Sequence, residues 1–155
     1  MRLSVELVPT SCWYSNVRSN VSAPTWARIS REVSMAAGRR CSICARVGVV
    51  HALECHEVWG YNDTARKQRL IELVALCPEC HAVKHMGRSL SMGRGREALA
   101  WLAQVNEITP AAALEHVRVA FAVHRARSLH TWTLDVTLLS TRYGVRLTPD
   151  GQERT

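Results

Sequence analysis

The sequence predicts an α+β fold in which a β-hairpin leads into a helix, with further helices before and after it. Two short stretches rich in β-branched residues, 49–59 and 69–76, are joined by a polar loop, which is typical of paired strands. Amphipathic helical patterns occupy 24–37 on one side and 94–128 on the other. Two C-x2-C pairs, at 41–44 and 77–80, enclose the hairpin.

The length and composition indicate one globular domain. A chain of 155 residues with 47% apolar and 21% charged residues is expected to fold as a single domain, 1–155. Within it we expect an N-terminal extension with a helix (1–37), a core (38–88) and a C-terminal helical extension (94–140). The sequence has no apolar run of about 18 residues and no signal-peptide pattern, so we expect no membrane contact and a cytoplasmic location. It leaves the oligomeric state open.

The N-terminal helix is predicted over 24–37. Pro24 suits the first helical turn, and Gly38 suits the end of the helix. Trp26, Ile29 and Val33 fall on one face, which we expect to pack on the core. Residues 7–22, "LVPTSCWYSNVRSNVS", are expected to be extended and rich in turns.

The hairpin should be followed by a helix that begins near Pro78. Two more helices are predicted after it, over 95–108 and 110–128, with Thr109 as the N-cap of the second. The apolar stripe of the second helix is expected to contain Leu114, Val117 and Phe121. Residues 131–139 are interpreted as a strand or as a short cap on the helices.

The net charge of +7 comes almost entirely from arginine, since Lys67 and Lys84 are the only lysines. Guanidinium groups bind phosphate through two parallel hydrogen bonds, and the release of counterions adds affinity that does not depend on sequence. A polyanionic partner such as DNA is therefore consistent with the composition, although many basic proteins bind no nucleic acid.

The C-x2-C pairs predict a metal site. Each pair places two thiolates of one tight turn where they can bind the same ion, so Cys41, Cys44, Cys77 and Cys80 are expected to hold a structural Zn²⁺. Iron shares this ligand set, and four buried reduced thiols are the plain alternative. Zinc is favoured because nothing else in the sequence indicates redox chemistry.

Two histidines follow the second cysteine pair and predict a further site. On a helix that begins at Pro78, His81 and His85 are four residues apart and share a face, close enough to bind one cation. The strand segment "ECHE", residues 54–57, is expected to face them. A metal held between a strand and a helix is the expected result.

These motifs resemble those of the HNH endonuclease family. The resemblance rests on "CSIC", "LECHEVW" and "LVALCPECHAVKH" in this order, and it covers 38–88. The flanks are similar to those of small bacterial HNH proteins. The resemblance implies a ββα-metal core and hydrolysis of DNA phosphodiester bonds. It further implies that His56 is the general base, and that Cys55, His81 and His85 bind a catalytic divalent cation: Mg²⁺, Mn²⁺, Ni²⁺ or Zn²⁺.

The chain departs from the family pattern at two positions. Cys55 stands where the family commonly has Asp or His, and Glu72 stands in place of the middle Asn, a role that we expect Asn62 to take. Basic residues near the motifs are expected either to contact DNA phosphates or to form a solvated face. They are Arg66, Lys67, Arg69, Lys84 and Arg88.

Three functions are compatible with these features. The first is a metal-dependent HNH endonuclease that nicks DNA or cuts both strands. The second is a non-catalytic, zinc-stabilised module that binds nucleic acid and carries a degenerate HNH site. The third is an adaptor whose C-terminal helices bind a larger protein. An enzyme needs His56, His81 and His85 to converge, whereas a binding module needs only the four cysteines and the arginines.

Overall fold

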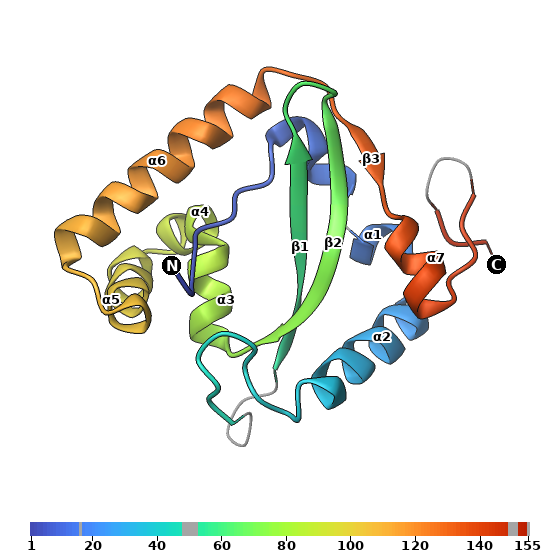
Figure 1. The fold of residues 1–155 in the computed structure, drawn as a ribbon, viewed down its shortest axis with the longest axis horizontal. Coiled ribbons are helices and arrows are strands. Elements are labelled where there is room, and N and C mark those ends of the chain that lie inside the picture. Colours follow the sequence, from blue (N-terminus) through green and yellow to red (C-terminus); the bar gives the residue numbers. More distant parts are fainter. Residues whose placement is uncertain (16, 48–52, 149–151, 155) are drawn as a thin grey trace.

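The computed structural model describes residues 1–155 with the exception of 16, 48–52, 149–151 and 155. A long, twisted hairpin crosses the centre of the molecule, and helices lie on both sides of it (Figure 1). The mixed α+β class is thereby confirmed. The elements are η1 (Thr10–Ser15), α1 (Val17–Asn20), α2 (Ala23–Ala36), β1 (Glu54–Asn62), β2 (Lys67–Leu76), α3 (Pro78–Lys84), α4 (Met86–Ser91), α5 (Gly95–Asn106), α6 (Pro110–Ser128), β3 (Thr133–Asp135) and α7 (Thr137–Tyr143).

The sheet has three strands in the order β1-β2-β3. β1 and β2 are antiparallel, and the short β3 runs parallel to the start of β2. The hairpin loop is shorter than predicted because both strands continue into the expected loop, as far as Asn62 and from Lys67. The predicted strand residues 49–52 lie outside the described residues.

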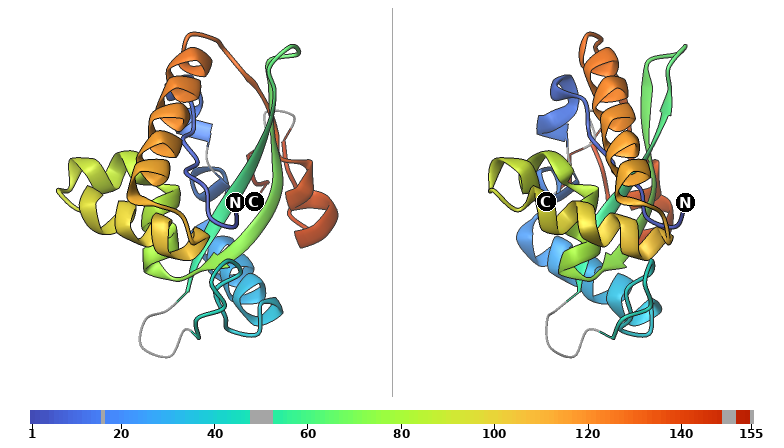
Figure 2. Two further views of the ribbon diagram at one scale, coloured as in Figure 1. Left: turned by 60° about the vertical axis from the view of Figure 1, so that its left-hand side comes forward. Right: turned by 90° about the vertical axis from the view of Figure 1, so that its left-hand side faces the viewer.

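The two faces of the hairpin carry separate hydrophobic clusters. On one face, α3, α5, α6 and the first residues of the chain enclose a cluster that includes Leu3, Leu76, Val83 and Leu102. On the other face, α2 and α7 enclose a cluster that includes Ile29, Leu73 and Leu139. The hairpin therefore separates two layers of helices, which the rotated views display (Figure 2). A side chain on β1 enters one cluster or the other according to its position along the strand.

The predicted helices are present on both sides of the hairpin. α2 buries Ile29 and Val33 as expected, and the Ser22 side chain caps it by accepting a hydrogen bond from the Thr25 amide. The Thr109 hydroxyl caps α6 in the same way, through the Ala112 amide. The expected stripe of α6 is partly wrong: Leu114 is 51% exposed, because this helix packs through Ala113 and Val117.

Two terminal segments are more ordered than predicted. Residues Thr10–Ser15 and Val17–Asn20 form short helical turns instead of an extended segment. After α6 the chain forms β3 and then α7, so the expected strand at 131–139 is only three residues long. None of the described helices has both the length and the apolar character that crossing a membrane requires.

Candidate metal centres

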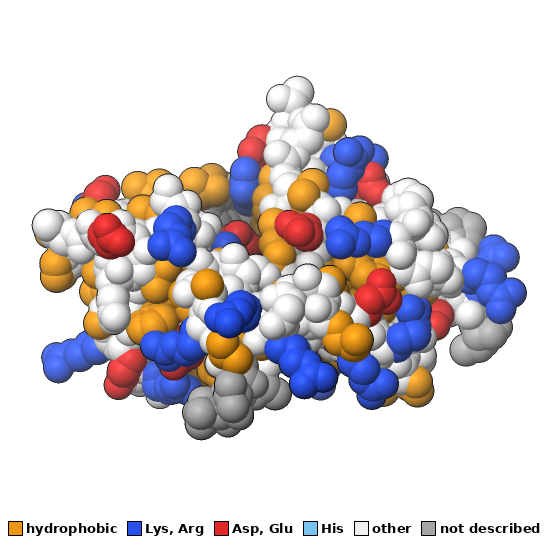
Figure 3. Space-filling model, turned by 60° about the horizontal axis from the view of Figure 1, so that its bottom comes forward, with side chains coloured by type: hydrophobic (Ala, Val, Ile, Leu, Met, Phe, Trp, Pro, Cys, Tyr) orange, Lys and Arg blue, Asp and Glu red, His pale blue; other side chains and the backbone are white. Residues whose placement is uncertain are grey.

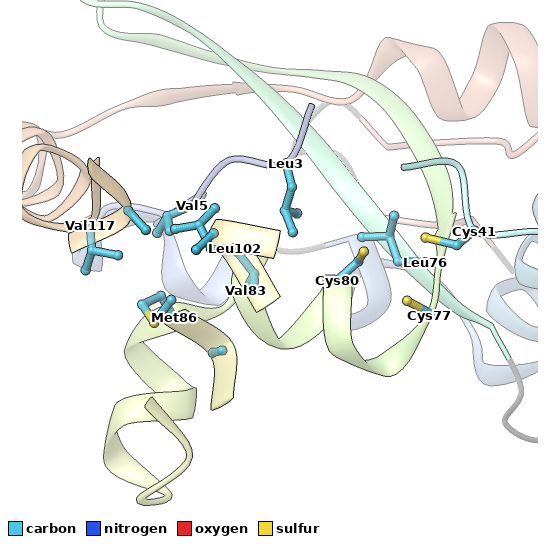
Figure 4. Packing of buried hydrophobic residues seen from close by; sticks show 13 residues of the cluster. Leu3, Val5, Cys41, Leu76, Cys77, Cys80, Val83, Met86, Leu102 and Val117 are labelled. Atoms are coloured by element: carbon cyan, nitrogen blue, oxygen red, sulfur yellow. The ribbon is translucent and has the colours of Figure 1, made fainter. Parts of the chain in front are cut away.

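The four cysteines converge as their spacing predicts. Their Sγ atoms all lie within 4.8 Å of one another. Cys41 and Cys44 belong to a turn that precedes the hairpin, Cys77 is the N-cap of α3, and Cys80 lies in the first turn of that helix. Figure 4 shows the sulfur atoms of Cys41, Cys77 and Cys80 directed toward one another beside Leu76. The cluster joins the turn, the end of β2 and the start of α3.

Backbone hydrogen bonds fix the Cys41–Cys44 turn. The Cys41 amide donates to the Arg46 carbonyl, and the Ala45 amide donates to the Cys41 carbonyl, both at 2.9 Å. Ala45 adopts a left-handed conformation with φ of 61°, which lets the chain reverse direction directly after Cys44. The Ser42 amide also donates to the Ala75 carbonyl of β2 at 2.8 Å. The turn is thus tied to the strand that delivers the other two cysteines.

The geometry and chemistry of the four thiols suit zinc. Four sulfur atoms at 2.3 Å from a tetrahedral Zn²⁺ are about 3.8 Å apart. The Sγ atoms of Cys44 and Cys77 are 3.6 Å apart. A hydrogen bond from the Cys80 thiol lowers the pKa of Cys41 to about 4 and raises the pKa of Cys80. Cys41 is therefore held as the thiolate that metal binding requires, and these four residues could hold a structural zinc ion.

Three histidines form a second cluster on the same side of the hairpin. His56 lies in β1, His81 in α3, and His85 directly after the last residue of α3. The ring centroids of His81 and His85 are 4.5 Å apart, and those of His56 lie 5.2 Å and 5.0 Å from them. One ring nitrogen from each histidine lies within 4.8 Å of the others. The strand β1 and the helix α3 with its C-cap residue therefore place three imidazole rings next to one another.

Carboxylates hold two of these rings. Oε2 of Glu6 lies 3.1 Å from Nε2 of His56, and a carboxylate oxygen of Glu54 contacts Nδ1 of His81. Histidines that bind metals usually donate their second N–H to a carboxylate, which fixes both the tautomer and the direction of the ring. In this arrangement His56 is left with Nδ1 and His81 with Nε2 for a cation.

His81 and His85 are held in the neutral state that binds metal. Burial, together with the charges of neighbouring groups, lowers the pKa of His85 to about 3. Burial also lowers the pKa of His81 below its usual value, against the opposing effect of Glu54. Burial alone would raise the pKa of Glu6, but hydrogen bonds from His56 and Lys84 lower it overall. The cluster thus combines two neutral imidazoles, those of His81 and His85, with the ionised carboxylate of Glu6 at neutral pH.

The placement of Cys55 differs from the expectation. Cys55 pairs with Ala75 across the hairpin and packs against the cluster that α2 and α7 enclose, whereas His56 faces α3. Successive side chains of a strand point to opposite faces, so only one of the two neighbours can meet the helix. Burial also raises the pKa of the Cys55 thiol to about 11. The expectation that Cys55 joins His81 and His85 is therefore wrong, and its neighbour His56 lies with them instead.

Asn62 also lies away from the histidines. It occupies the last position of β1, six residues beyond His56, which corresponds to about 20 Å along a strand. Its Oδ1 accepts a hydrogen bond from the Ala65 amide and stabilises the hairpin turn. The expectation that Asn62 acts at the histidine site is therefore wrong. Glu72 is exposed, pairs with Val58 across the hairpin and does not join the histidines either.

The predicted basic residues divide into three environments. Lys84 is buried and bonded to Glu6 and Ser4, so it cannot reach a phosphate in solvent, contrary to expectation. Lys67 and Arg69 pair with Asp135, and Arg66 lies over the Trp132 ring; all three lie at the far end of the hairpin. Arg88 is exposed, and its charge contributes to the lowered pKa of both His81 and His85. Among the exposed residues of this predicted set, Arg88 is therefore the candidate for a phosphate contact beside the histidines.

The distribution of charge over the surface is broad. Figure 3 shows Lys and Arg side chains scattered across one face of the molecule, with acidic side chains between them, and no single dense cluster. This arrangement fits a net charge of +7 that is spread over the whole chain.

Glu6 is the site residue that sequence reasoning missed. It lies in the N-terminal segment, 50 positions before His56. No motif spacing links the two residues, because the contact is made by the fold. A lone acidic residue within an apolar stretch, "LSVELV", is the one local signal that could have drawn attention to it.

Comparisons with models of known protein families, with curated proteins and with solved structures found no match. The two clusters of potential metal ligands, one of four cysteines and one of three histidines, are therefore the features from which a function can be argued.

Proposed function

We propose that the protein is a metal-dependent endonuclease of the HNH type that hydrolyses phosphodiester bonds of DNA. The observation that carries the proposal is the convergence of His56, His81 and His85 at a place separate from the four cysteines. A binding module stabilised by zinc alone would have no use for this second group of ligands.

The two ligand sets suit different tasks. A site closed by four thiolates has no position left for a substrate and is typical of structural zinc. Three protein ligands leave one or more positions open, which is typical of catalytic metal sites, and imidazole suits Zn²⁺, Ni²⁺ and related ions. When bound, a divalent cation would act as a Lewis acid that stabilises the charge developing on a phosphate and lowers the pKa of water.

We assign His56 to the cation and not to the role of free general base. Its side chain is 4% exposed, and Glu6 holds one of its two ring nitrogens. A general base must come within hydrogen-bond reach of the attacking water, which this burial opposes. Since Cys55 faces the other side of the hairpin, His56 is also the β1 side chain that can complete a ligand set with His81 and His85.

DNA is the proposed substrate because of the charge. The net charge of +7 favours a polyanion. Arg88 is exposed and follows His85 by three positions. None of the ion pairs found among the described residues includes it. A guanidinium at this place can bind a phosphate next to the one being cut. This contact would position the strand without selecting its sequence.

The proposal is tested by cleavage of supercoiled plasmid DNA in Mg²⁺, Mn²⁺, Ni²⁺ or Zn²⁺. We expect His85→Asn to abolish nicking with folding and zinc content retained, and we expect the exposed His130→Asn to cleave like the wild type. Protein that binds metal at both sites and binds DNA, yet never cleaves it, would instead support the non-catalytic nucleic-acid-binding module.

A further inference from the structure

We propose that Glu6 is a positioning residue of the histidine site. Its carboxylate orients the His56 ring so that the opposite nitrogen faces the cation. This inference rests on the metal site of the proposed function and adds a third segment of the chain to it, the N-terminal residues Ser4–Glu6.

Two contacts fix the carboxylate of Glu6. One oxygen, Oε2, lies 3.1 Å from Nε2 of His56, and the other, Oε1, is bonded to Nζ of Lys84. Because each oxygen has a different partner, the plane of the carboxylate cannot rotate without the loss of a charge-assisted hydrogen bond. The Lys84 side chain is 7% exposed, so it acts inside the protein and compensates the charge of Glu6.

The backbone holds the same segment in place. The Glu6 amide donates to the Lys84 carbonyl at 3.1 Å, and the Val5 amide donates to Nε2 of His116 at 3.0 Å. Leu3 is fully buried, and its amide donates to Oδ1 of Asn106. The N-terminal segment is therefore anchored at successive residues to α3, α5 and α6. A side chain that merely happened to reach the site would not need this support.

The relation of Glu6 to His56 repeats that of Glu54 to His81. In both pairs a carboxylate takes one ring nitrogen and leaves the other for a metal. The repetition indicates an orienting role, because each carboxylate reaches the site through a histidine. Among the described residues, the set whose ligand atoms lie within 4.8 Å of one another contains the three histidines and neither carboxylate.

The experiment measures the affinity of Co²⁺ for protein whose four-cysteine site already holds one equivalent of Zn²⁺. The visible absorption of Co²⁺ reports both the occupancy and the donor atoms of the second site. The variants are Glu6→Gln, which removes the charge and keeps the shape, and Glu115→Gln, which removes an exposed charge from α6 as a matched control. Glu6→Gln leaves the charge of Lys84 without its carboxylate partner, which could prevent folding. In that case the double variant Glu6→Gln/Lys84→Met, which removes both charges, takes the place of Glu6→Gln.

We expect Glu6→Gln, or the double variant, to weaken Co²⁺ binding by about 10- to 100-fold, the usual cost of losing a carboxylate behind a histidine ligand. The absorption spectrum at saturation should keep its shape, because the donor atoms are unchanged. Glu6→Asp, which restores the charge, should recover part of the affinity. Glu115→Gln should match the wild type.

Three results would overturn the inference. If Glu6→Gln bound Co²⁺ within twofold of the wild type while His56→Asn bound it clearly more weakly, Glu6 would have no positioning role. The histidine site itself would still stand. A changed spectrum at saturation would make Glu6 a direct ligand and not a positioning residue. Unchanged Co²⁺ binding in both His56→Asn and His85→Asn would overturn the role of Glu6 together with the metal site of the proposed function.

Discussion

The indole N–H of Trp101 donates a hydrogen bond to Sγ of Cys80 across 3.2 Å. Trp101 belongs to α5, so this bond connects a C-terminal helix to the four-cysteine cluster. The guanidinium of Arg46, from the turn after Cys44, lies 4.5 Å from the centre of the same indole ring. A donor to a metal-bound thiolate reduces the charge on sulfur and holds the ligand in place. α5 therefore supports the cysteine cluster directly.

Replacement of Trp101 tests this connection. Trp101→Phe keeps an aromatic ring but removes the donor, so we expect Zn²⁺ to transfer faster to a chelator and the free energy of unfolding to fall by about 1–3 kcal/mol. Chelator competition and urea unfolding of the zinc-loaded protein measure the two effects. Trp26→Phe, on α2 and away from the cysteines, is the control. Equal rates of zinc loss in the two variants would contradict a supporting role for Trp101.

The cysteine cluster should control folding. Cys80→Ser removes one of four zinc ligands, and since zinc binding and folding are coupled, we expect the core around α3 to lose its cooperative thermal transition. Cys12→Ser is the control, because Cys12 is buried but outside both ligand sets. It should keep one equivalent of zinc and lose about 1 kcal/mol. A Cys80→Ser protein that lacks zinc but melts like the wild type would exclude a structural site.

The neighbours Cys55 and His56 should respond in opposite ways. Cys55→Ala removes a side chain from the cluster beneath α2, so we expect a loss of about 1 kcal/mol of stability and unchanged binding of the second cation. His56→Ala should lose that cation and keep the zinc of the four cysteines. Metal analysis together with thermal unfolding separates the two outcomes. Loss of the second cation in Cys55→Ala would mean that the strand presents its other face to α3.

The stability of the chelator-treated protein should depend on pH through His85. Its folded pKa, about 3, lies below the usual 6.5, so the unfolded chain takes up the proton first as the pH falls. The stabilisation is therefore present above pH 6.5 and is lost as the pH drops toward 3, with a slope of up to about 1.4 kcal/mol per pH unit. Urea unfolding at several pH values in this interval should give a shallower dependence for His85→Asn. If the free energy of unfolding changed with pH equally in the wild type and in His85→Asn, the lowered pKa of His85 would be contradicted.

Arg88 and Arg69 should differ in their contribution to DNA binding. Arg69 already pairs with Asp135 at the far end of the hairpin, whereas Arg88 is exposed beside His85. We expect Arg88→Ala to lower the dependence of log affinity on log salt by about 0.9, the effect of one phosphate contact, and Arg69→Ala to change it little. Fluorescence anisotropy with a labelled duplex at several salt concentrations measures both. Identical slopes for Arg88→Ala and the wild type would exclude the contact.

Local patterns in the sequence were sufficient for the cysteine cluster and for the helix that carries the histidines. C-x2-C spacing forces two thiols together within one turn, and Pro78 fixes where α3 begins, so His81 and His85 follow on one face. These features need no information about distant parts of the chain. The same is true of α2, whose apolar period and Ser22 cap are local.

Features that depend on register or on distant contacts could not be obtained this way. "ECHE" offers alternating side chains, and a slip of one residue would have turned Cys55 instead of His56 toward α3, so the motif alone cannot choose between them. The hairpin length placed Asn62 far from His56, although the two are near in sequence. The pair of buried Lys84 and half-buried Glu6 requires the N-terminal segment to lie against α3, which no periodicity indicates.

The anchoring of residues 3–6 has a consequence for the order in which the protein assembles. Glu6 is synthesised before any of the histidines, and its side-chain partners His56 and Lys84 are added to the chain later. The cysteine turn can close as soon as residue 80 emerges, but the histidine site needs the first and the middle parts of the chain together. Its occupancy would therefore report that the whole core has formed, and not α3 alone.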